Sequence, residues 1–474
     1  MKAGREVSNS WVLVLASLAS FMVALDTLVV TTALSTIRLD LSASVEQLEW
    51  TVNAYNVSFA VLLMTAAGVG DRFGRRRMFS VGLGVFAAAS AASALAPSIG
   101  LLIAARAAQG VGAALVTTLA LAILSATFAP EQRGKALGMF FAVTGLAVAS
   151  GPLVGGAIAE GIAWQWIFWI NVPIGLALIP LVRARMPESR GPDTALDIRG
   201  LAFVTGGVLG IVWGLVRGNI AGWGSFEVVG TLAAGALLLV AFVAWQLRAP
   251  APMLPMRYFR SAAFRAGNTT SFFAVASLFG AVFFLAQFLQ TSLDYGPLGA
   301  GLRLLPWTAT LFFVAPVAGI LVDKIGERPF LVAGPLLQAI GMGWMALVAS
   351  PDMAYSALIA PMIVSGVGIS MSFPAAQNSV VGSVPEDAVG KASGINTTMR
   401  ELGGVFGIAI AVAMFAGAGS YASAQAFSDG FVAAIATSAG LSLLAAIAGS
   451  TLPSRRTISA APLSSATPAF EEVA

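Results

Sequence analysis

The stretch AGVGDRFGRR at residues 67–76 ends a long apolar block, and GILVDKIGER at residues 319–328 ends another. In each copy a small residue lies four positions before an aspartate, and a glycine lies three positions after that aspartate. Asp71 and Asp323 are 252 residues apart. The recurrence indicates that the chain contains two copies of one local unit.

A second matched pair supports the same repeat. PEQRGKALG at residues 130–138 opens one apolar block, and PEDAVGKASG at residues 385–394 opens another, with one residue inserted in the later copy. Their lysines, Lys135 and Lys391, are 256 residues apart. Two motifs repeated at nearly one offset predict two homologous parallel halves, which is an architecture of membrane transporters.

Composition places the chain in a membrane. Of the 474 residues, 58% are hydrophobic and only 10% are charged, whereas a soluble globular protein carries about 25% charge. Apolar blocks of roughly 18 residues or more are typical of membrane-spanning helices. Fourteen blocks fall near residues 11–34, 48–70, 78–96, 99–128, 136–159, 166–183, 199–216, 226–247, 268–293, 299–322, 329–349, 354–380, 394–416 and 429–452.

These blocks predict an all-α polytopic membrane protein of about fourteen transmembrane helices. Two six-helix bundles cover residues 1–183 and 266–452. The segment 184–265 belongs to neither copy of the repeat and is predicted to be a linker region with two extra transmembrane helices. Residues 453–474 are expected to form a cytoplasmic tail.

The distribution of basic residues predicts the orientation. With the N-terminus in the cytoplasm, 21 of the 26 Lys and Arg residues lie in cytoplasmic segments, and only Arg38 and Arg217 lie in outer loops. By the positive-inside rule both termini are cytoplasmic, in a bacterial-type inner membrane. The same bias accounts for the net charge of +4, so we expect the partner to be the lipid bilayer and not nucleic acid.

The residue types that are missing narrow the chemistry. The sequence has no cysteine and no histidine, which excludes disulfides and a metal site of Cys and His ligands. It has no phosphate-binding G-x-x-x-x-G-K-[ST] loop, so ATP drive within this chain is not expected. We therefore expect no metal, no cofactor and no enzymatic activity. A membrane enzyme or sensor is the alternative class, and no enzymatic motif or sensory domain favours it.

Carboxylates inside apolar blocks are the proton-binding candidates. Asp26 lies in the middle of the first block, where a charge costs roughly 2.5–3.5 kcal/mol or more and is functional by default. Arg106 lies at the same depth, roughly 10–12 Å from the outer surface at 1.5 Å per residue, and is its expected partner. A purely structural ion pair is the alternative role of these two residues. Glu401 is a further intramembrane carboxylate beside Arg400, either a proton or cation site or part of a structural pair.

Two motifs suggest conformational gating. In the repeated loop an aspartate can pair with an arginine or accept hydrogen bonds from a helix N-terminus, and a glycine permits a tight turn. Topology anchoring alone is the alternative role. The gating candidates of this loop are Asp71, Arg72, Gly74, Arg75, Asp323 and Gly326.

The second gating motif lies in the fifth block. Glycines and a proline in a membrane helix allow close approach of its neighbours and bending, which suits a moving element, although static packing would use them too. The residues are Gly151, Pro152, Gly155 and Gly156.

Aromatic and amide side chains within the apolar blocks are candidates for a substrate pocket. Such side chains give an adaptable apolar surface with a few polar contacts. The candidates are Trp50, Asn53, Tyr55, Phe283, Gln287, Gln290, Trp307, Phe373 and Asn378.

Several of these motifs, in order, resemble a known family. The loop at 67–76 is similar to the helix 2–3 motif of the major facilitator superfamily, and GPLVGG at 151–156 resembles the signature of its antiporters. LDT at 25–27, RAAQGVG at 106–112 and WQWIFWINVPIG at 164–175 resemble its fourteen-helix drug–proton antiporter branch.

The resemblance implies a monomeric, proton-coupled antiporter that exports hydrophobic, cationic or neutral drugs or metabolites by alternating access. A proton-coupled uptake symporter on the same scaffold is the alternative. Small-molecule substrate and protons would be the partners.

Overall fold

The computed structural model describes residues 9–128, 130–191, 196–385 and 388–453, and these residues form a helical bundle without strands. Almost all of the predicted tail lies outside the described residues. The α-helices are α1 (Asn9–Asp40), α2 (Val45–Phe73), α3 (Arg75–Ala94), α4 (Ile99–Thr127), α5 (Pro130–Gly161), α6 (Trp166–Trp169), α7 (Asn171–Arg185), α8 (Ile198–Ala221), α9 (Phe226–Gln246), α10 (Ala262–Thr291), α11 (Pro297–Arg303), α12 (Leu305–Thr308), α13 (Thr310–Ile325), α14 (Arg328–Val348), α15 (Ser356–Val381), α16 (Val389–Ala418) and α17 (Ala424–Ser450). A 3₁₀ helix, η1 (Met256–Arg260), precedes α10.

The predicted number of membrane-spanning helices is confirmed. In the described part of the chain, 13 helices are long and apolar enough to cross a membrane, and α2 makes a fourteenth if its two segments, bent by 56°, form one span. Short helices join into single spans, as α6 does with α7 and as α11 and α12 do with α13. The fold class expected from the apolar blocks is therefore correct.

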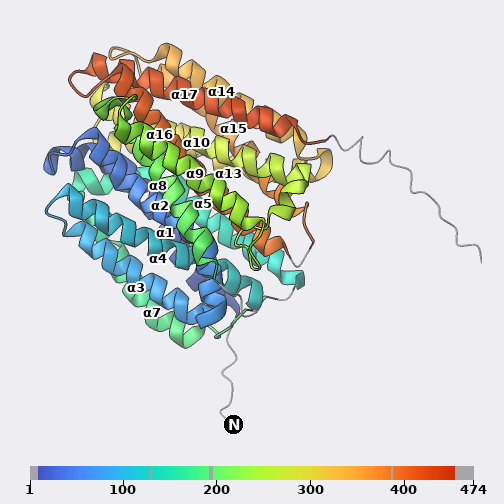
Figure 1. Ribbon diagram of the computed structural model, residues 1–474. Coiled ribbons are helices and arrows are strands. Elements are labelled where there is room, and N and C mark those ends of the chain that lie inside the picture. Colours follow the sequence, from blue (N-terminus) through green and yellow to red (C-terminus); the bar gives the residue numbers. More distant parts are fainter. Residues whose placement is uncertain (1–8, 129, 192–195, 386–387, 454–474) are drawn as a thin grey trace, which may run out of the picture.

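The helices fall into two groups and a pair. Helices α1–α7 form the first group and pack mainly on one another. Helices α10–α17 form the second group and do the same, except that α11 packs mainly on α5. The pair α8 and α9 pack on each other, and α8 contacts α2 of the first group and α16 of the second. In Figure 1 this green pair crosses the middle of the view, between the blue helices and the yellow-to-red ones. The limits predicted for the three parts stay predictions.

Helix α1 begins and α17 finishes at the same end of the bundle (Figure 1), which we call the terminal end, and the opposite end is the distal end. Serine N-caps start four helices at the distal end, because a serine oxygen accepts the free backbone N–H of the first turn. The caps are Ser44, Ser98, Ser225 and Ser423.

Glycines in the left-handed region terminate helices. Gly74 follows α2 with φ 102°, and Gly326 follows α13 with φ 90°. A residue with a side chain adopts such a backbone at a cost. The two copies of the repeated loop therefore turn on the same type of residue with the same sign of φ.

The helices run past the apolar blocks at two expected loops. Arg38 lies in the last turn of α1, and Arg217 lies inside α8, so the expectation that both lie in loops is wrong. Charged groups at the distal end explain the extension of α8, since Arg217 pairs with Glu46 of α2 at 3.7 Å and Glu227 of α9 at 2.9 Å.

The two groups of helices pack against each other toward the distal end. One apolar cluster there includes Val29 and Leu34 of α1, Phe284 of α10 and Phe415 of α16. Ser35 of α1 hydrogen-bonds to the side chain of Gln290 on α10. The structure is thus closed between the groups along α1 and α10 at this end.

Candidate functional site

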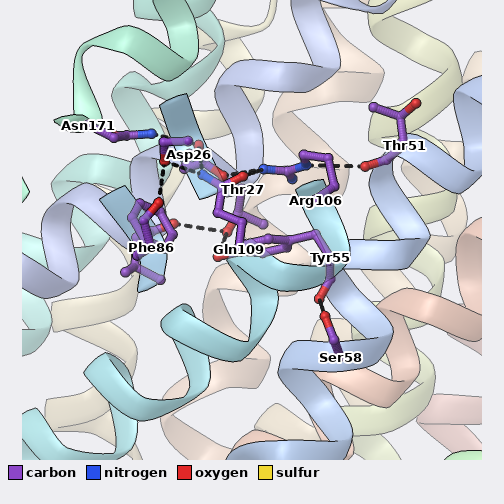
Figure 2. Close-up of polar contacts among 11 residues, drawn as sticks. Asp26, Thr27, Thr51, Tyr55, Ser58, Phe86, Arg106, Gln109 and Asn171 are labelled. Atoms are coloured by element: carbon purple, nitrogen blue, oxygen red, sulfur yellow. Dashed lines mark hydrogen bonds and ion pairs between the residues drawn. The ribbon is translucent and has the colours of Figure 1, made fainter. Parts of the chain in front are cut away.

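A buried polar network surrounds Asp26 in the first group of helices (Figure 2). Arg106 of α4 donates from Nη1 to Asp26 Oδ2 at 2.5 Å. Gln109 of α4 and Asn171 of α7 each donate from the side-chain amide to Asp26 Oδ1 at 2.8 Å. One carboxylate therefore joins three helices through one charged and two neutral donors.

Arg106 is held on several sides at once. Its Nε donates to the carbonyl oxygen of Thr51 on α2 at 3.2 Å, and its Nη1 also donates to Gln109 Oε1 at 2.7 Å. Its guanidinium lies 4.3 Å from the ring centroid of Tyr55, a cation–π contact. The side chain is fully buried, so these contacts replace water around the cation.

Local sequence explains the assembly. Arg106 and Gln109 are three residues apart on α4, so they share one face of the helix. Gln109 Nε2 also reaches Ser90 Oγ of α3 at 2.9 Å, which fixes the direction of its amide. Thr27, next to Asp26, is within 3.5 Å of the Tyr55 hydroxyl. The network therefore connects α1, α2, α3, α4 and α7.

The chemistry of this site follows from its burial. A buried carboxylate–guanidinium pair is stable only while both partners are charged and hydrogen-bonded, because removing one charge leaves the other uncompensated. A proton placed on Asp26 would cancel that charge and weaken the hold on Arg106. Loss of either charge would therefore weaken the packing among α1, α4 and α7.

Glu401 stands apart from this network. It lies on α16, and no ion pair to it occurs among the described residues. The neighbouring Arg400 instead places its guanidinium 4.3 Å from the ring centroid of Phe373 on α15. The two adjacent side chains therefore have different surroundings, as expected for helix positions about 100° apart.

The first copy of the loop motif makes contacts within the first group. Arg75 and Asp71 form an ion pair at 2.7 Å across the turn at Gly74. The backbone N–H of Arg76 donates to Glu188, beyond α7, at 2.9 Å. The guanidinium of Arg72 lies 5.4 Å from the ring centroid of Phe73. Asp71 thus ties the ends of α2 and α3 together.

In the second copy, Gly326 ends α13, as described above. The side chain of Asp323 lies outside the described part of the structure. A shared role of the two aspartates stays a prediction.

The glycines of α5 lie where other helices come closest. A Cβ on Gly155 would be 2.4 Å from the carbonyl oxygen of Val29 on α1, and a Cβ on Gly156 would be 2.3 Å from that of Pro297 on α11. These distances leave no room for a side chain. One helix of the first group is therefore sandwiched between α1 and a helix of the second group.

The rest of the motif extends the same contact surface. Gly151 faces Leu28 of α1, where a Cβ would lie 2.8 Å from the leucine Cβ. The carbonyl oxygen of Pro152 would lie 2.4 Å from a Cβ on Gly301 of α11.

The nine predicted substrate residues do not gather in one place. Tyr55 belongs to the Arg106 network, and Trp50 packs on Trp213 of α8 with ring centroids 5.9 Å apart. Asn53 donates to Glu49 at 3.0 Å.

The candidates of the second group are also dispersed. Phe283 and Trp307 are buried in the apolar cluster at the distal end, and Gln290 bonds to Ser35 of α1. Gln287 accepts a hydrogen bond from the hydroxyl of Tyr421.

Two substrate candidates lie on α15, toward the terminal end. Phe373 contacts Arg400, as noted above. Asn378 borders a pocket at the terminal end, beside Gly326. The set therefore extends from one end of the bundle to the other.

Sequence reasoning missed three residues of this region. Gln109 and Asn171 lie inside stretches that carry the family resemblance, and the three-residue spacing from Arg106 was a usable signal for Gln109. Glu49 lies inside an apolar block and is fully buried.

Comparisons with known proteins agree with this architecture. The family model described as Major Facilitator Superfamily matches residues 16–408, with a second match at 268–469. The chain is 34% identical to the tetracenomycin C resistance and export protein of Streptomyces glaucescens, over 82% of this chain and 72% of that protein. It is 35% identical to the cephamycin export protein of Amycolatopsis lactamdurans, over 91% of each.

Solved structures show the same fold. A bacterial homologue of the human lysosomal transporter Spinster, in an inward-facing and unoccupied conformation, superposes with a TM-score of 0.67. It is 17% identical in sequence, and the match covers 94% of this chain and 98% of that one.

Proposed function

This chain belongs to the major facilitator superfamily, and we propose that it is a proton-coupled antiporter that exports hydrophobic, cationic or neutral, compounds. The family consists of multi-pass membrane transporters, and the chain is one. The observation that carries the proposal is the buried network of Asp26, Arg106, Gln109 and Asn171.

Protonation of Asp26 is the proposed coupling step. The deprotonated carboxylate binds Arg106 and the two amides, and a proton on it removes the charge that holds them. A proton then favours one packing of α1, α4 and α7 over another, and a ligand shifts such an equilibrium only through its different affinity for the two states. Proton and substrate compete because each favours the opposite state.

Export is favoured over uptake by the relatives. Two of them, named as export proteins for tetracenomycin C and cephamycin, match at 34% and 35% identity over most of this chain. The resemblance of the GPLVGG motif at residues 151–156 to the antiporter signature supports the same direction. The proton-coupled symporter remains the alternative on this scaffold.

Orientation follows from the excess of basic residues. We infer that the terminal end lies in the cytoplasm and the distal end faces outward, in a bacterial-type cytoplasmic membrane. The structure, closed between the groups at its distal end, then corresponds to a state closed to the outside. We propose that one chain is the functional unit and that the proton gradient is the energy source, without a cofactor.

Glu401 suggests the charge of part of the substrate range. It has no ion partner among the described residues, and a lone carboxylate inside a membrane favours a cation. Neutral compounds would bind through apolar and aromatic contacts alone. We therefore propose that Glu401 widens the range to cationic compounds and is not required for neutral ones.

Proteoliposomes test the proposal. With an imposed pH gradient, the wild-type protein should transport ethidium against the ethidium concentration gradient. Asp26→Asn should lose this transport driven by the pH gradient. Asn keeps the size of the side chain and imitates the protonated state. Asp429→Asn makes the same change at an exposed site that contacts Gln425, and it should behave as wild type. Full gradient-driven transport by Asp26→Asn would remove Asp26 from the mechanism.

Direction needs a second readout. Cells that produce the wild-type protein should accumulate less ethidium than cells without it. Greater accumulation would instead support the symporter.

A further inference from the structure

A second buried carboxyl lies on α2, outside the Asp26 network. Glu49 has an exposed fraction of 0%. Asn53 Nδ2 donates to Glu49 Oε1 at 3.0 Å, whereas Glu49 Oε2 has no hydrogen-bond partner within the described structure. Asn53 Oδ1 and both amide atoms of Asn56 are also buried there without partners. Glu49, Asn53 and Asn56 are separated by four and then three residues, so they lie on one face of α2.

The cations near this face are already committed elsewhere. Arg106 of α4 contacts Thr51 and Asp26, and Arg217 of α8 pairs with Glu46 and Glu227. Glu46, one turn before Glu49, is negative and opposes a second negative charge.

The described residues of the other packed helices offer no counter-ion either. On α16, Arg400 contacts the ring of Phe373, and Glu401 is itself acidic. On α1, Arg38 stacks on Tyr421 at 4.1 Å to the ring centroid. The described basic residues of α3, Arg75–Arg77, begin that helix at the terminal end. No ion pair among the described residues thus balances a charge on Glu49.

Glu49 lies beside the contact between the two groups at the distal end. Glu49 is in the second turn of α2, and its neighbours Leu48 and Val52 belong to the cluster that includes Phe284 and Phe415 of the second group. Helix α2 packs along α16 of that group. When the two groups separate at this end, water reaches the region and can hydrate a carboxylate.

We propose that Glu49 is a second proton-binding site, and that the distal end closes only when Glu49 is protonated. A charged carboxylate buried without a partner is strongly unfavourable, whereas the neutral acid is compatible with the closed arrangement. A proton from the distal side would bind Oε2 when that end is open. This inference rests on the proposed alternating access, and it adds a step that Asp26 does not provide.

Spin-label distances measure the closure directly, without substrate or gradient. The natural chain has no cysteine, so two introduced cysteines are the only labelled sites. Leu39 on α1 and Leu347 on α14 are 77% and 88% exposed near the distal end. In the Leu39→Cys, Leu347→Cys protein, the distance between labels should lengthen as the pH rises from 5.5 to 8.5.

Glu49→Gln should abolish that shift and keep the short distance at both pH values, because its amide is neutral and can still bind Asn53. Asp352→Asn, at an exposed position near the distal end, is the control, and it should keep the wild-type shift. Glu49→Asp retains a titratable group and should restore a shift. The same series with Asp26→Asn separates the two carboxyls.

Two results would overturn the proposal: a wild-type distance that does not change with pH, or a Glu49→Gln protein that keeps the full wild-type shift. Neither would affect the proposed antiport, which is judged by gradient-driven transport through Asp26. Conversely, a pH-dependent closure lost in Glu49→Gln would stand even if Asp26→Asn transported normally.

Discussion

Two aspartates in this protein are each held by several hydrogen bonds, but their donors differ in kind. Asp26 is inside the first group of helices and binds the guanidinium of Arg106. Asp197 caps α8 and accepts from Trp245 Nε1 at 2.7 Å, Gln246 Nε2 at 2.6 Å and the Gly200 N–H at 2.8 Å, all neutral donors.

The difference in donors determines how far the effect of protonation would extend from each carboxylate. Protonation of Asp26 would leave a buried cation without its counter-ion, so the change spreads to Arg106 and the helices around it. Protonation of Asp197 would weaken only a local link between α8 and α9. Transport should therefore depend on the first aspartate, and stability on the second.

The sharpest way to break this comparison is Arg106→Lys, which keeps the charge but not the planar set of donors. Lysine cannot bind Asp26, Gln109 and the Thr51 carbonyl together in the same geometry. Hydrogen bonds to charged groups are worth about 1.5–3 kcal/mol each, so gradient-driven ethidium transport should fall about tenfold or more. Arg248→Lys, at an exposed position, is the control. Transport above half of wild type would show that charge alone suffices.

Glu401→Gln should have the next largest effect, and a selective one. If the carboxylate binds cationic substrates, the ethidium concentration that gives half-maximal transport should rise about fivefold or more. A change of this size corresponds to typical coupling energies. A neutral lipophilic substrate should be transported as before. Substrate-concentration series in proteoliposomes measure both. Equal loss for both classes would instead assign Glu401 to proton coupling or structure.

Asp71→Asn should slow transport about two- to fivefold, since partly exposed ion pairs contribute about 0.2–1 kcal/mol. The carboxylate ties α2 to α3 through Arg75 at 2.7 Å, and Asn retains an acceptor but not the charge. Protein yield should not change. The effect is measured as the transport rate of Asp71→Asn compared with that of wild type. Asp352→Asn, which changes an exposed distal aspartate, is the control. Wild-type rates for Asp71→Asn would reduce the motif to topology anchoring.

The fold was predictable because its signals are long and repeated. Blocks of apolar residues decide helix number by length alone, and the paired motifs at residues 67–76 and 319–328 predict two halves. Helix ends were less predictable, as Arg38 and Arg217 show, because an ion pair or cation–π contact can extend a helix past its apolar block.

The site was predictable in part. Depth along the helices placed Asp26 beside Arg106, and the structure shows the contact at 2.5 Å. The substrate residues were less accessible to sequence reasoning, because the direction of an aromatic side chain depends on packing between helices far apart in the chain. Trp50 illustrates this, since its partner Trp213 belongs to the extra helix α8.

The smallest expected effect on transport is that of Asp197→Ala, and it sharpens the other side of the comparison. Ala removes the N-cap of α8 and the acceptor of Trp245 and Gln246. Loss of a cap typically costs about 0.5–2 kcal/mol, so the melting temperature in detergent should fall while gradient-driven transport stays within about twofold of wild type. Asp352→Asn serves again as the exposed control.

The pH dependence of that destabilisation has a definite sign. Burial opposes the charge on Asp197, but hydrogen bonds from Trp245, Gly200 and Gln246, with a weaker one from Met253, outweigh it and lower the pKa of the carboxyl. A lowered pKa in the folded state stabilises the fold above the unfolded value of about 3.9, and this contribution disappears as the pH falls through the folded pKa. The gap in melting temperature between wild type and Asp197→Ala should therefore be constant near neutral pH and narrow below about pH 4. A gap that instead widened on acidification would mean that neutral Asp197 holds α8 to α9 better than the carboxylate does.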